Sequence, residues 1–169
     1  MGAKDHRTEA EGESIRCAVL VVSDTKTEAT DTSGKEAVAL IQKFGHQAVQ
    51  CTFVPNDPAK IRRTLRTSLR DADVVVTIGG TGPSTRDVTI ETVRPLFAKE
   101  LPGFGELFRG RSVSQIGTAV ILTRAALGIT AKGRVVACVP GSTAAVRLAL
   151  EEILLQELKH LVWDARRYR

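Results

Sequence analysis

The chain has few aromatic residues and no long apolar run. Only 4% of its 169 residues are Phe, Trp or Tyr, and no basic–aromatic pattern offers a stacking surface for nucleic acid. No window contains the roughly 18 consecutive apolar residues that a membrane span needs. Residues 1–15 are polar, of mixed charge and without the apolar stretch of a secretory signal, so we expect a disordered tail. These absences predict a soluble, cytoplasmic protein without nucleic-acid or membrane partners.

Cysteine and histidine are too scarce and too scattered to indicate a site. Cys17, Cys51 and Cys138 stand in apolar runs without metal-ligand or redox spacing, and we interpret them as small buried hydrophobic side chains. The three histidines are spread along the chain, and covalent catalysis has no candidate nucleophile. Lys and Arg number 24 against 19 Asp and Glu, a net charge of +5 that favours anionic partners such as phosphates.

Apolar, valine-rich runs alternate with segments of helical periodicity. The runs are typical of buried strands and cover 17–22, 48–54, 73–78 and 134–139. The clearest helical segments cover 34–44, 58–70 and 143–163. Alternation of this kind predicts an α/β fold with a mainly parallel sheet and helices on both faces. We expect a single domain over residues 16–169.

The least regular part of the chain lies between the third and fourth of these runs. Residues 99–112 contain Pro102 and three glycines, and we expect a longer excursion there. Residues 113–129 fit either a helix or a strand, and we favour a helix.

The helices carry signals beyond their periodicity. Ser33 and Glu36 have the spacing of a capping box, in which the two residues satisfy each other's backbone donors. The last helix is apolar on two sides, with Leu148, Leu155 and Val162 on the second side. A helix of this kind is either enclosed in the core or faces another subunit. The second helix places its arginines outward, on an expected solvated face: Arg62, Arg63, Arg66 and Arg70.

Polar and glycine-rich segments follow each predicted strand. In a parallel sheet the carboxyl ends of the strands meet at one edge, where loop amides and helix N-termini converge on ligands. We therefore expect the site at this edge. The segments are Ser23-Asp24, Pro55-Asn56-Asp57, Gly79 to Thr89 and Pro140-Gly141-Ser142.

The strongest single motif is the glycine-rich loop within residues 76–89, VTIGGTGPSTRDVT. Glycines directly after a buried strand let backbone N–H groups approach an anion, and the following helix would add its positive end. The loop is neither a Walker A motif nor a dinucleotide fingerprint, because Thr85 stands where a third glycine would be. We expect a cradle for an anion or nucleotide. The structural alternative is a tight turn capped by Asp87.

Carboxylates at this edge have two interpretations each. Asp87 is either a helix N-cap or a carboxylate that holds Mg²⁺ against phosphate oxygens, since an unpaired anion would repel the ligand. Asp57 precedes a proline, as an N-cap does, but it is also the second candidate metal ligand. Asp24 could simply turn the chain, and Ser142 is either an N-cap or a phosphate ligand. The pattern indicates metal-assisted phosphate chemistry or plain binding of an anion.

Five segments together resemble the MoaB/MogA family of molybdenum cofactor biosynthesis, over about residues 16–163. The opening segment is more similar to the MoaB branch than to the MogA branch. The segments are VSDTKTEATDTSG (22–34), GGTGPSTRDVT (79–89), LPGFGELFR (101–109), LTRAALG (122–128) and VPGS (139–142).

The resemblance implies a three-layer α/β/α fold that assembles as homo-oligomers, trimers or hexamers. It implies binding of molybdopterin, a pterin with a phosphorylated side chain, and in active members the transfer of AMP from Mg-ATP to that phosphate. Asp87 matches a catalytic carboxylate of the family. The residues implied to bind nucleotide and pterin are Gly79, Gly80, Thr81 and Gly82 in the loop, with Ser23, Asp24, Pro140, Gly141 and Ser142 completing the pocket.

The sequence departs from the family pattern at one important position. The family's other catalytic Asp directly follows the proline at the end of the second strand. Here Asn56 holds that position and the carboxylate follows at Asp57. A smaller departure is Thr123, where the family pattern has Ser. Two hypotheses follow: an adenylyltransferase in which Asp87, with Asp57 or Asn56, positions Mg²⁺, or a protein that binds molybdopterin without turning it over.

Overall fold

The structure is a computed structural model that describes residues 13–167. A six-stranded sheet in the order β2-β1-β3-β6-β5-β4 forms its centre. The first four of these strands are parallel, β5 is antiparallel to β6, and β4 is antiparallel to β5. The strands are β1 (Arg16–Val22), β2 (Gln47–Val54), β3 (Val74–Ile78), β4 (Phe97–Glu100), β5 (Ala126–Thr130) and β6 (Val135–Val139).

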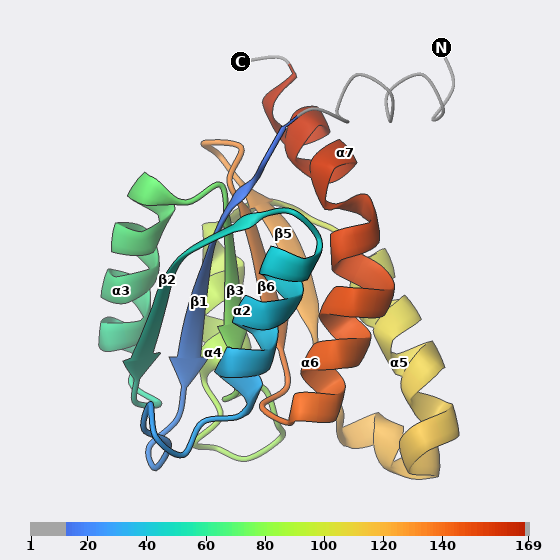
Figure 1. The fold of residues 1–169 in the computed structure, drawn as a ribbon. Coiled ribbons are helices and arrows are strands. Elements are labelled where there is room, and N and C mark those ends of the chain that lie inside the picture. The colour runs from blue at the N-terminus through green and yellow to red at the C-terminus, as the bar shows by residue number, and fades with distance from the viewer. Residues whose placement is uncertain (1–12, 168–169) are drawn as a thin grey trace.

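Helices cover both faces of the sheet, which confirms the predicted three-layer α/β/α fold (Figure 1). On one face lie α2 (Ser33–Lys43), α5 (Pro102–Ile116) and a long final helix. That helix consists of α6 (Thr143–Ala149), a π-helical turn, η3 (Leu150–Leu154), and α7 (Leu155–Arg166). On the other face lie α3 (Pro58–Asp71) and α4 (Thr89–Val93). Two 3-10 segments, η1 (Arg94–Leu96) and η2 (Gly117–Leu122), complete the fold.

The alternation of side chains along each strand builds a separate core on each face. In β1, Val19 and Val21 pack into the cluster under α2, α5 and the final helix, while Leu20 and Val22 pack into the cluster under α3 and α4. Both sets are at most 3% exposed, as expected for a strand that is covered on both sides.

The register brings the ends of the four parallel strands together. Val22 pairs with Val54, the neighbouring Val21 pairs with Ile78, and Ile78 pairs with Val139. The polar segments that follow these strands therefore start from one edge of the sheet, as predicted.

The region between residues 97 and 130 differs from the expectation. The expected excursion at 99–112 is largely helix α5, and the helix favoured over 113–129 is wrong beyond Leu122, because residues 126–130 form strand β5. Residues 126–130 form a strand because they pair with β6. The local periodicity of the sequence does not record this tertiary contact. Gly128 also admits the Phe97 ring of β4: a Cβ at this glycine would lie 2.2 Å from the ring.

The capping box predicted at Ser33 and Glu36 is wrong. Ser33 is already the first helical residue of α2, so its hydroxyl is one position too late to cap. The Asp31 side chain caps the start of α2 instead, because its Oδ2 accepts from the Gly34 N–H at 2.8 Å. Ser33 Oγ donates to Asp31 Oδ1 at 3.0 Å, and Glu36 pairs with Arg147 at 2.5 Å.

The expectations for the tail and for Cys51 also need correction. Ile15, assigned to the tail, is 1% exposed in the core, and its N–H donates to Nδ1 of His46. Residues 1–12 lie outside the described part of the chain. Cys17 and Cys138 are buried, and burial raises both thiol pKa values to about 12. Cys51 is exposed, because β2 is an edge strand and only part of its length is covered.

The final helix is enclosed within the chain's own core. Leu148, Leu155 and Val162 are all at most 5% exposed, and the helix packs against both α2 and α5. Of the two expectations for the second apolar side, enclosure in the core and contact with another subunit, the structure therefore supports enclosure in the core. Within residues 13–167, no helix is both long and apolar enough to span a membrane.

Candidate functional site

Two hollows meet at the carboxyl edge of the parallel strands and form one groove. One has a volume of about 280 Å³ and the other about 410 Å³. They share Gly79, Gly80, Asp87 and Gly141. We call their union the strand-edge groove. The shared residues make the two hollows adjacent along the glycine loop.

The loop glycines are required by their backbone conformation and by close contacts. Gly79 has φ +96° and Gly80 has φ +64°, the left-handed region that favours glycine. A Cβ at Gly79 would lie 2.4 Å from the Val22 carbonyl oxygen. At Gly80 it would lie 2.3 Å from Thr89 Oγ1 and 2.5 Å from Asn56 Oδ1. The double glycine therefore lets the loop pass directly over the ends of β1 and β2.

Arg124 holds the loop by its carbonyl groups. Its guanidinium donates to the carbonyl oxygens of Thr81 at 2.8 Å and Gly82 at 3.0 Å, and it pairs with Glu91, whose pKa it lowers. The backbone N–H groups of Gly80, Thr81 and Gly82 donate no hydrogen bond within residues 13–167. The loop therefore keeps its amide donors available for an anion.

Asp87 lies where the two hollows join. Its Oδ2 accepts from the Ser84 N–H at 3.2 Å, and a Cβ at Gly82 would lie 2.7 Å from that oxygen. The capping alternative is not realised, because α4 begins at Thr89 with Val88 at the N-cap position and no side-chain cap. This helix has only five residues, so the expected contribution from its positive end is small. The Asp87 carboxylate has no ion-pair partner in the described part of the chain.

Asp24 and Asn56 form a second polar pair in the larger hollow. Asp24 accepts from the Asn56 backbone N–H at 2.9 Å and from its side-chain amide at 3.3 Å. These bonds, with Arg86 at 3.8 Å, hold the pKa of Asp24 below its usual value. The remaining side-chain oxygen of Asn56, Oδ1, is buried and accepts no hydrogen bond.

Two predicted site residues act as helix caps outside the strand-edge groove. Asp57 Oδ1 accepts from the Lys60 N–H at 2.9 Å at the start of α3. Ser142 Oγ accepts from the Ala145 N–H at 3.1 Å at the start of α6. Neither side chain lines the groove. In the structure both residues therefore act as the helix N-caps that were the alternative expectation, and Asp57 does not lie where it would bind a metal in the groove.

The other predicted residues do line the strand-edge groove. Ser23 lies in the larger hollow, where its Oγ accepts from the backbone N–H groups of Thr25 and Lys26. Thr81 and Pro140 line the smaller hollow. The structure thus brings together the residues of four segments that are far apart in the sequence.

Lys26 is a groove residue that sequence reasoning missed. Its Nζ donates to the Gly141 carbonyl at 2.9 Å and to Ser33 Oγ at 2.8 Å, and it lies 3.7 Å from Asp31 Oδ1. It therefore ties the loop after β1 to the loop after β6. A lysine in a polar loop resembles any surface lysine, so the local pattern carried no signal for this role, although Lys26 lies within the family-like segment 22–34.

The far wall of the smaller hollow was also not predicted from local patterns. Leu122, the last residue of η2, and the following Thr123 and Arg124 line the smaller hollow together with the glycine loop. Leu122 is 56% exposed there. Only the family-like LTRAALG segment could have pointed to this wall, since residues 122–124 lie some forty positions beyond the loop.

The polar groups of the strand-edge groove fit a Mg²⁺ that arrives with a phosphate. Asp24 and Asp87 line the same hollow, and Asn56, whose side-chain amide donates to Asp24, also lines it. No group of three or more His, Cys, Asp or Glu that could hold a metal occurs among the described residues. Mg²⁺ is commonly bound by one or two carboxylates and completes its shell with substrate phosphates and water. The donor set suits that mode better than a permanent protein-enclosed site.

The chain is similar to known proteins along nearly its whole length. Residues 18–160 match a family model described as "Probable molybdopterin binding domain". Molybdenum cofactor biosynthesis protein B of Bacillus subtilis (strain 168) is 40% identical over 170 residues, which cover 99% of both chains.

Solved structures give the same result. The crystal structure of a molybdenum cofactor biosynthesis protein B has a TM-score of 0.88 and 41% identity, and the match covers 92% of this chain and 98% of that one. The tungsten cofactor synthesizing protein MoaB from Pyrococcus furiosus has a TM-score of 0.83 and 40% identity, over 91% and 98%. The chain therefore belongs to the molybdopterin-binding domain family of the MoaB and MogA proteins of molybdenum cofactor biosynthesis.

Proposed function

We propose that the protein transfers AMP from Mg-ATP to the phosphate of molybdopterin. One observation carries this proposal: two hollows joined at Asp87 place unpaired backbone amides and two carboxylates along one groove. A groove of this kind suits two phosphate-bearing substrates that meet at a metal-binding carboxylate.

In the reaction, an oxygen of the molybdopterin phosphate attacks the α-phosphorus of ATP. The bond from that phosphorus to the bridging oxygen of the β-phosphate breaks, and pyrophosphate leaves. The amides of Gly80, Thr81 and Gly82 would donate to the oxygens that gain charge at the phosphorus, an electrostatic stabilisation that is often the largest catalytic effect. Arg124 keeps those amides in position, and Lys26 fixes the opposite loop.

Mg²⁺ would neutralise charge on the ATP phosphates, and Asp87 and Asp24 are the residues that would hold it. Asp87 has no cation partner in the described chain, so it is available for this purpose. Asp24 keeps a low pKa and is therefore ionised at neutral pH. Asn56 stands where the family pattern has a carboxylate, and its side-chain amide donates to Asp24.

The second candidate function is binding of molybdopterin without turnover. Asn56 favours it, because a neutral amide oxygen binds Mg²⁺ more weakly than a carboxylate does. In this version the strand-edge groove has the same ligands, but the metal site is too weak to support transfer.

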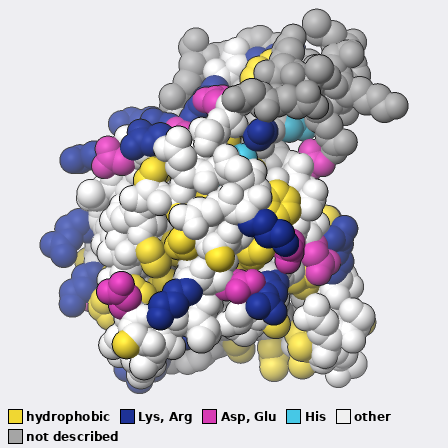
Figure 2. Space-filling model, in the orientation of Figure 1, with side chains coloured by type: hydrophobic (Ala, Val, Ile, Leu, Met, Phe, Trp, Pro, Cys, Tyr) yellow, Lys and Arg dark blue, Asp and Glu magenta, His cyan; other side chains and the backbone are white. Residues whose placement is uncertain are grey.

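We also propose that the chain assembles as a homo-oligomer through an apolar patch on α5 and η2. We define the patch as Leu107, Val113, Ile116, Ile121 and Leu122, which are 44–81% exposed. Hydrophobic side chains are visible on the surface over this lower end of the molecule (Figure 2). Clustered exposed apolar side chains of this kind are typical of protein–protein contacts. Because Leu122 also lines the smaller hollow, the contact would adjoin the groove.

The test is to incubate the protein with ATP and molybdopterin, with and without Mg²⁺, and to separate the products by chromatography. AMP transfer predicts Mg²⁺-dependent formation of adenylylated molybdopterin above the protein-free control. Tight molybdopterin binding without product would support the binding protein instead. Absence of both would refute both functions.

A further inference from the structure

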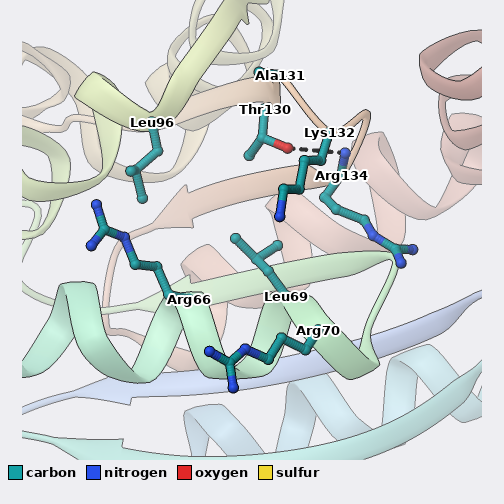
Figure 3. A pocket seen from close by; sticks show the side chains of 8 residues that line it. All are labelled: Arg66, Leu69, Arg70, Leu96, Thr130, Ala131, Lys132 and Arg134. Carbon is teal, nitrogen blue, oxygen red and sulfur yellow. Dashed lines mark hydrogen bonds between the residues drawn. The ribbon is translucent and has the colours of Figure 1, made fainter. Parts of the chain in front are cut away.

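A second cavity lies at the opposite edge of the sheet from the strand-edge groove. It is bounded by the C-terminal half of α3, by η1 and by the turn between β5 and β6 (Figure 3). Its volume of about 630 Å³ lies in the range of small-molecule sites, which is roughly 300–1,000 Å³. We call it the basic cleft. Its principal lining residues are Arg66, Leu69, Arg70, Leu96, Lys132 and Arg134.

Three cations in the basic cleft lack a partner. Arg66, Arg70 and Lys132 make no side-chain hydrogen bond or ion pair within residues 13–167, and no acidic side chain lines the cleft. Arg134 differs, because it pairs with Asp73, which Arg166 also contacts. Like charges gathered in this way repel one another, and a bound anion relieves the repulsion. The α3 side of the molecule shows many further Lys and Arg side chains (Figure 2).

Apolar side chains lie among these cations. Leu69 and Leu96 are half-buried, come from different elements and point into the cleft (Figure 3). The helical periodicity predicted Leu69 as an inward residue, and it does pack against the core while leaving part of its surface in the cleft. The cleft therefore offers an apolar floor as well as a charged rim.

The turn that carries Lys132 is rigidly built. The Gly133 N–H donates to the Thr130 carbonyl at 2.8 Å, and the Arg134 N–H donates to Thr130 Oγ1 at 3.1 Å. Gly133 has φ +62°, which closes the turn. These bonds fix the backbone of Lys132 across the cleft from Arg66 and Arg70, so the ammonium group starts from a defined position.

We propose that the basic cleft binds a small phosphorylated molecule with an apolar ring. Arg66, Arg70 and Lys132 supply the positive charge that attracts a phosphate dianion, and Leu69 and Leu96 receive the ring. An extended nucleic acid fits less well, because no aromatic side chain lines the cleft to stack a base. This inference does not depend on AMP transfer, since none of its residues lines the strand-edge groove.

The probe for the test is 1-naphthyl phosphate, which combines an apolar ring with a phosphate dianion. We expect saturable binding by calorimetry, with 1-naphthol and inorganic phosphate each binding at least about tenfold more weakly at the same ionic strength. Methyl NMR signals of Leu69 and Leu96 should shift on binding. Lack of saturation, or equal binding of inorganic phosphate, would overturn the proposal.

Charge-reversal variants locate the probe. Arg66→Glu and Arg70→Glu should each raise its Kd by about tenfold or more, with an unchanged circular dichroism spectrum. Arg63→Glu is the matched control, because Arg63 is exposed on the same helix but does not line the cleft. Equal weakening by Arg63→Glu would mean general charge attraction. Tighter binding in Asp87→Asn, which removes a negative charge from the strand-edge groove, would place the probe in that groove, and either result would refute the site.

Discussion

Asn56 donates two hydrogen bonds to the carboxylate of Asp24, one from its backbone and one from its side-chain amide. One of the two bonds therefore depends on the neutral side-chain amide of Asn56. An aspartate at position 56 would keep the backbone bond but replace the side-chain donor with a second negative charge.

Asn56→Asp should consequently make the site depend on a cation. Without Mg²⁺ we expect a lower melting temperature than in the wild type, because Asp24 loses a donor and gains a like charge. Mg²⁺ should restore stability and raise transfer activity. Asn56→Ala, which removes the donor without adding charge, is the control and should not respond to Mg²⁺ in this way. Equal Mg²⁺ responses in both variants would contradict this account of the pair.

Asp87→Asn should strongly slow AMP transfer without unfolding the protein. The side chain does not cap α4, so its loss leaves the helix start intact, while the carboxylate that faces the phosphates becomes neutral. We expect the rate to fall by about 10²–10³-fold, the effect of removing one electrostatic group from a transition state. Rate and melting temperature should be measured together. A full-rate variant would remove Asp87 from the mechanism.

Arg124→Gln should loosen the glycine loop. The variant loses the hydrogen bonds to the carbonyl groups of Thr81 and Gly82, which stabilise the fold by about 1 kcal/mol each. KM for ATP should rise, because the amide donors of the loop are no longer held in place. Arg94→Gln is the matched control, since Arg94 pairs with Glu100 away from the groove. The same rise in KM in both variants would argue against a positioning role.

His46 should make the fold sensitive to acid. It is 6% exposed, its Nδ1 accepts from the Ile15 N–H, and burial, with Lys159 nearby, lowers its pKa below 6.5. The unfolded chain therefore binds a proton at a higher pH than the folded chain. The free energy of unfolding should fall as the pH drops below about 6.5, by at most about 1.4 kcal/mol per pH unit, until the folded-state pKa is passed.

His46→Asn should reduce this acid sensitivity, as measured by urea unfolding across that range. The control is His160→Asn, because His160 lies beside Glu157 and Asp164 rather than in the core. We expect the control to retain the acid-induced loss of stability. An unchanged pH profile in His46→Asn would show that another group is responsible.

Ile121→Glu should lower the mass of the assembly in sedimentation experiments. Ile121 is the most exposed residue of the proposed contact on α5 and η2, at 81%, and a buried carboxylate there would oppose association. Val49→Glu, on the edge strand β2 outside that patch, should leave the mass unchanged. The same mass in Ile121→Glu and wild type would exclude this patch as the contact.

Much of the fold could be predicted because its signals are local. The valine-rich strands β1, β3 and β6 and the helix α3 were identifiable from periodicity and from the Asp57-Pro58 start. Strand β5 was not, because its partner β6 determines it. The capping of α2 by Asp31 was missed because the spacing of Ser33 and Glu36 gave a competing local signal.

The site was predictable to a similar extent. Gly79 and Gly80 could be identified because a double glycine directly after a buried strand is typical of a loop that approaches a ligand or a neighbouring backbone closely. Asp87 could be identified because it is the carboxylate of the same loop. Lys26 and Arg124 could not be found in the same way, because each acts on a loop that is distant in sequence. Both residues act by donating hydrogen bonds to backbone carbonyl groups. Such bonds cannot be predicted from the pattern of side chains along the sequence.

The most direct test of the central claim uses ATP labelled at the α-phosphate, mixed with molybdopterin, Mg²⁺ and the protein. AMP transfer predicts that the label appears in the pterin product, with one pyrophosphate released for each labelled product. Label that stays in ATP while molybdopterin binds tightly, or that appears only as free AMP or ADP, would contradict the proposed transfer.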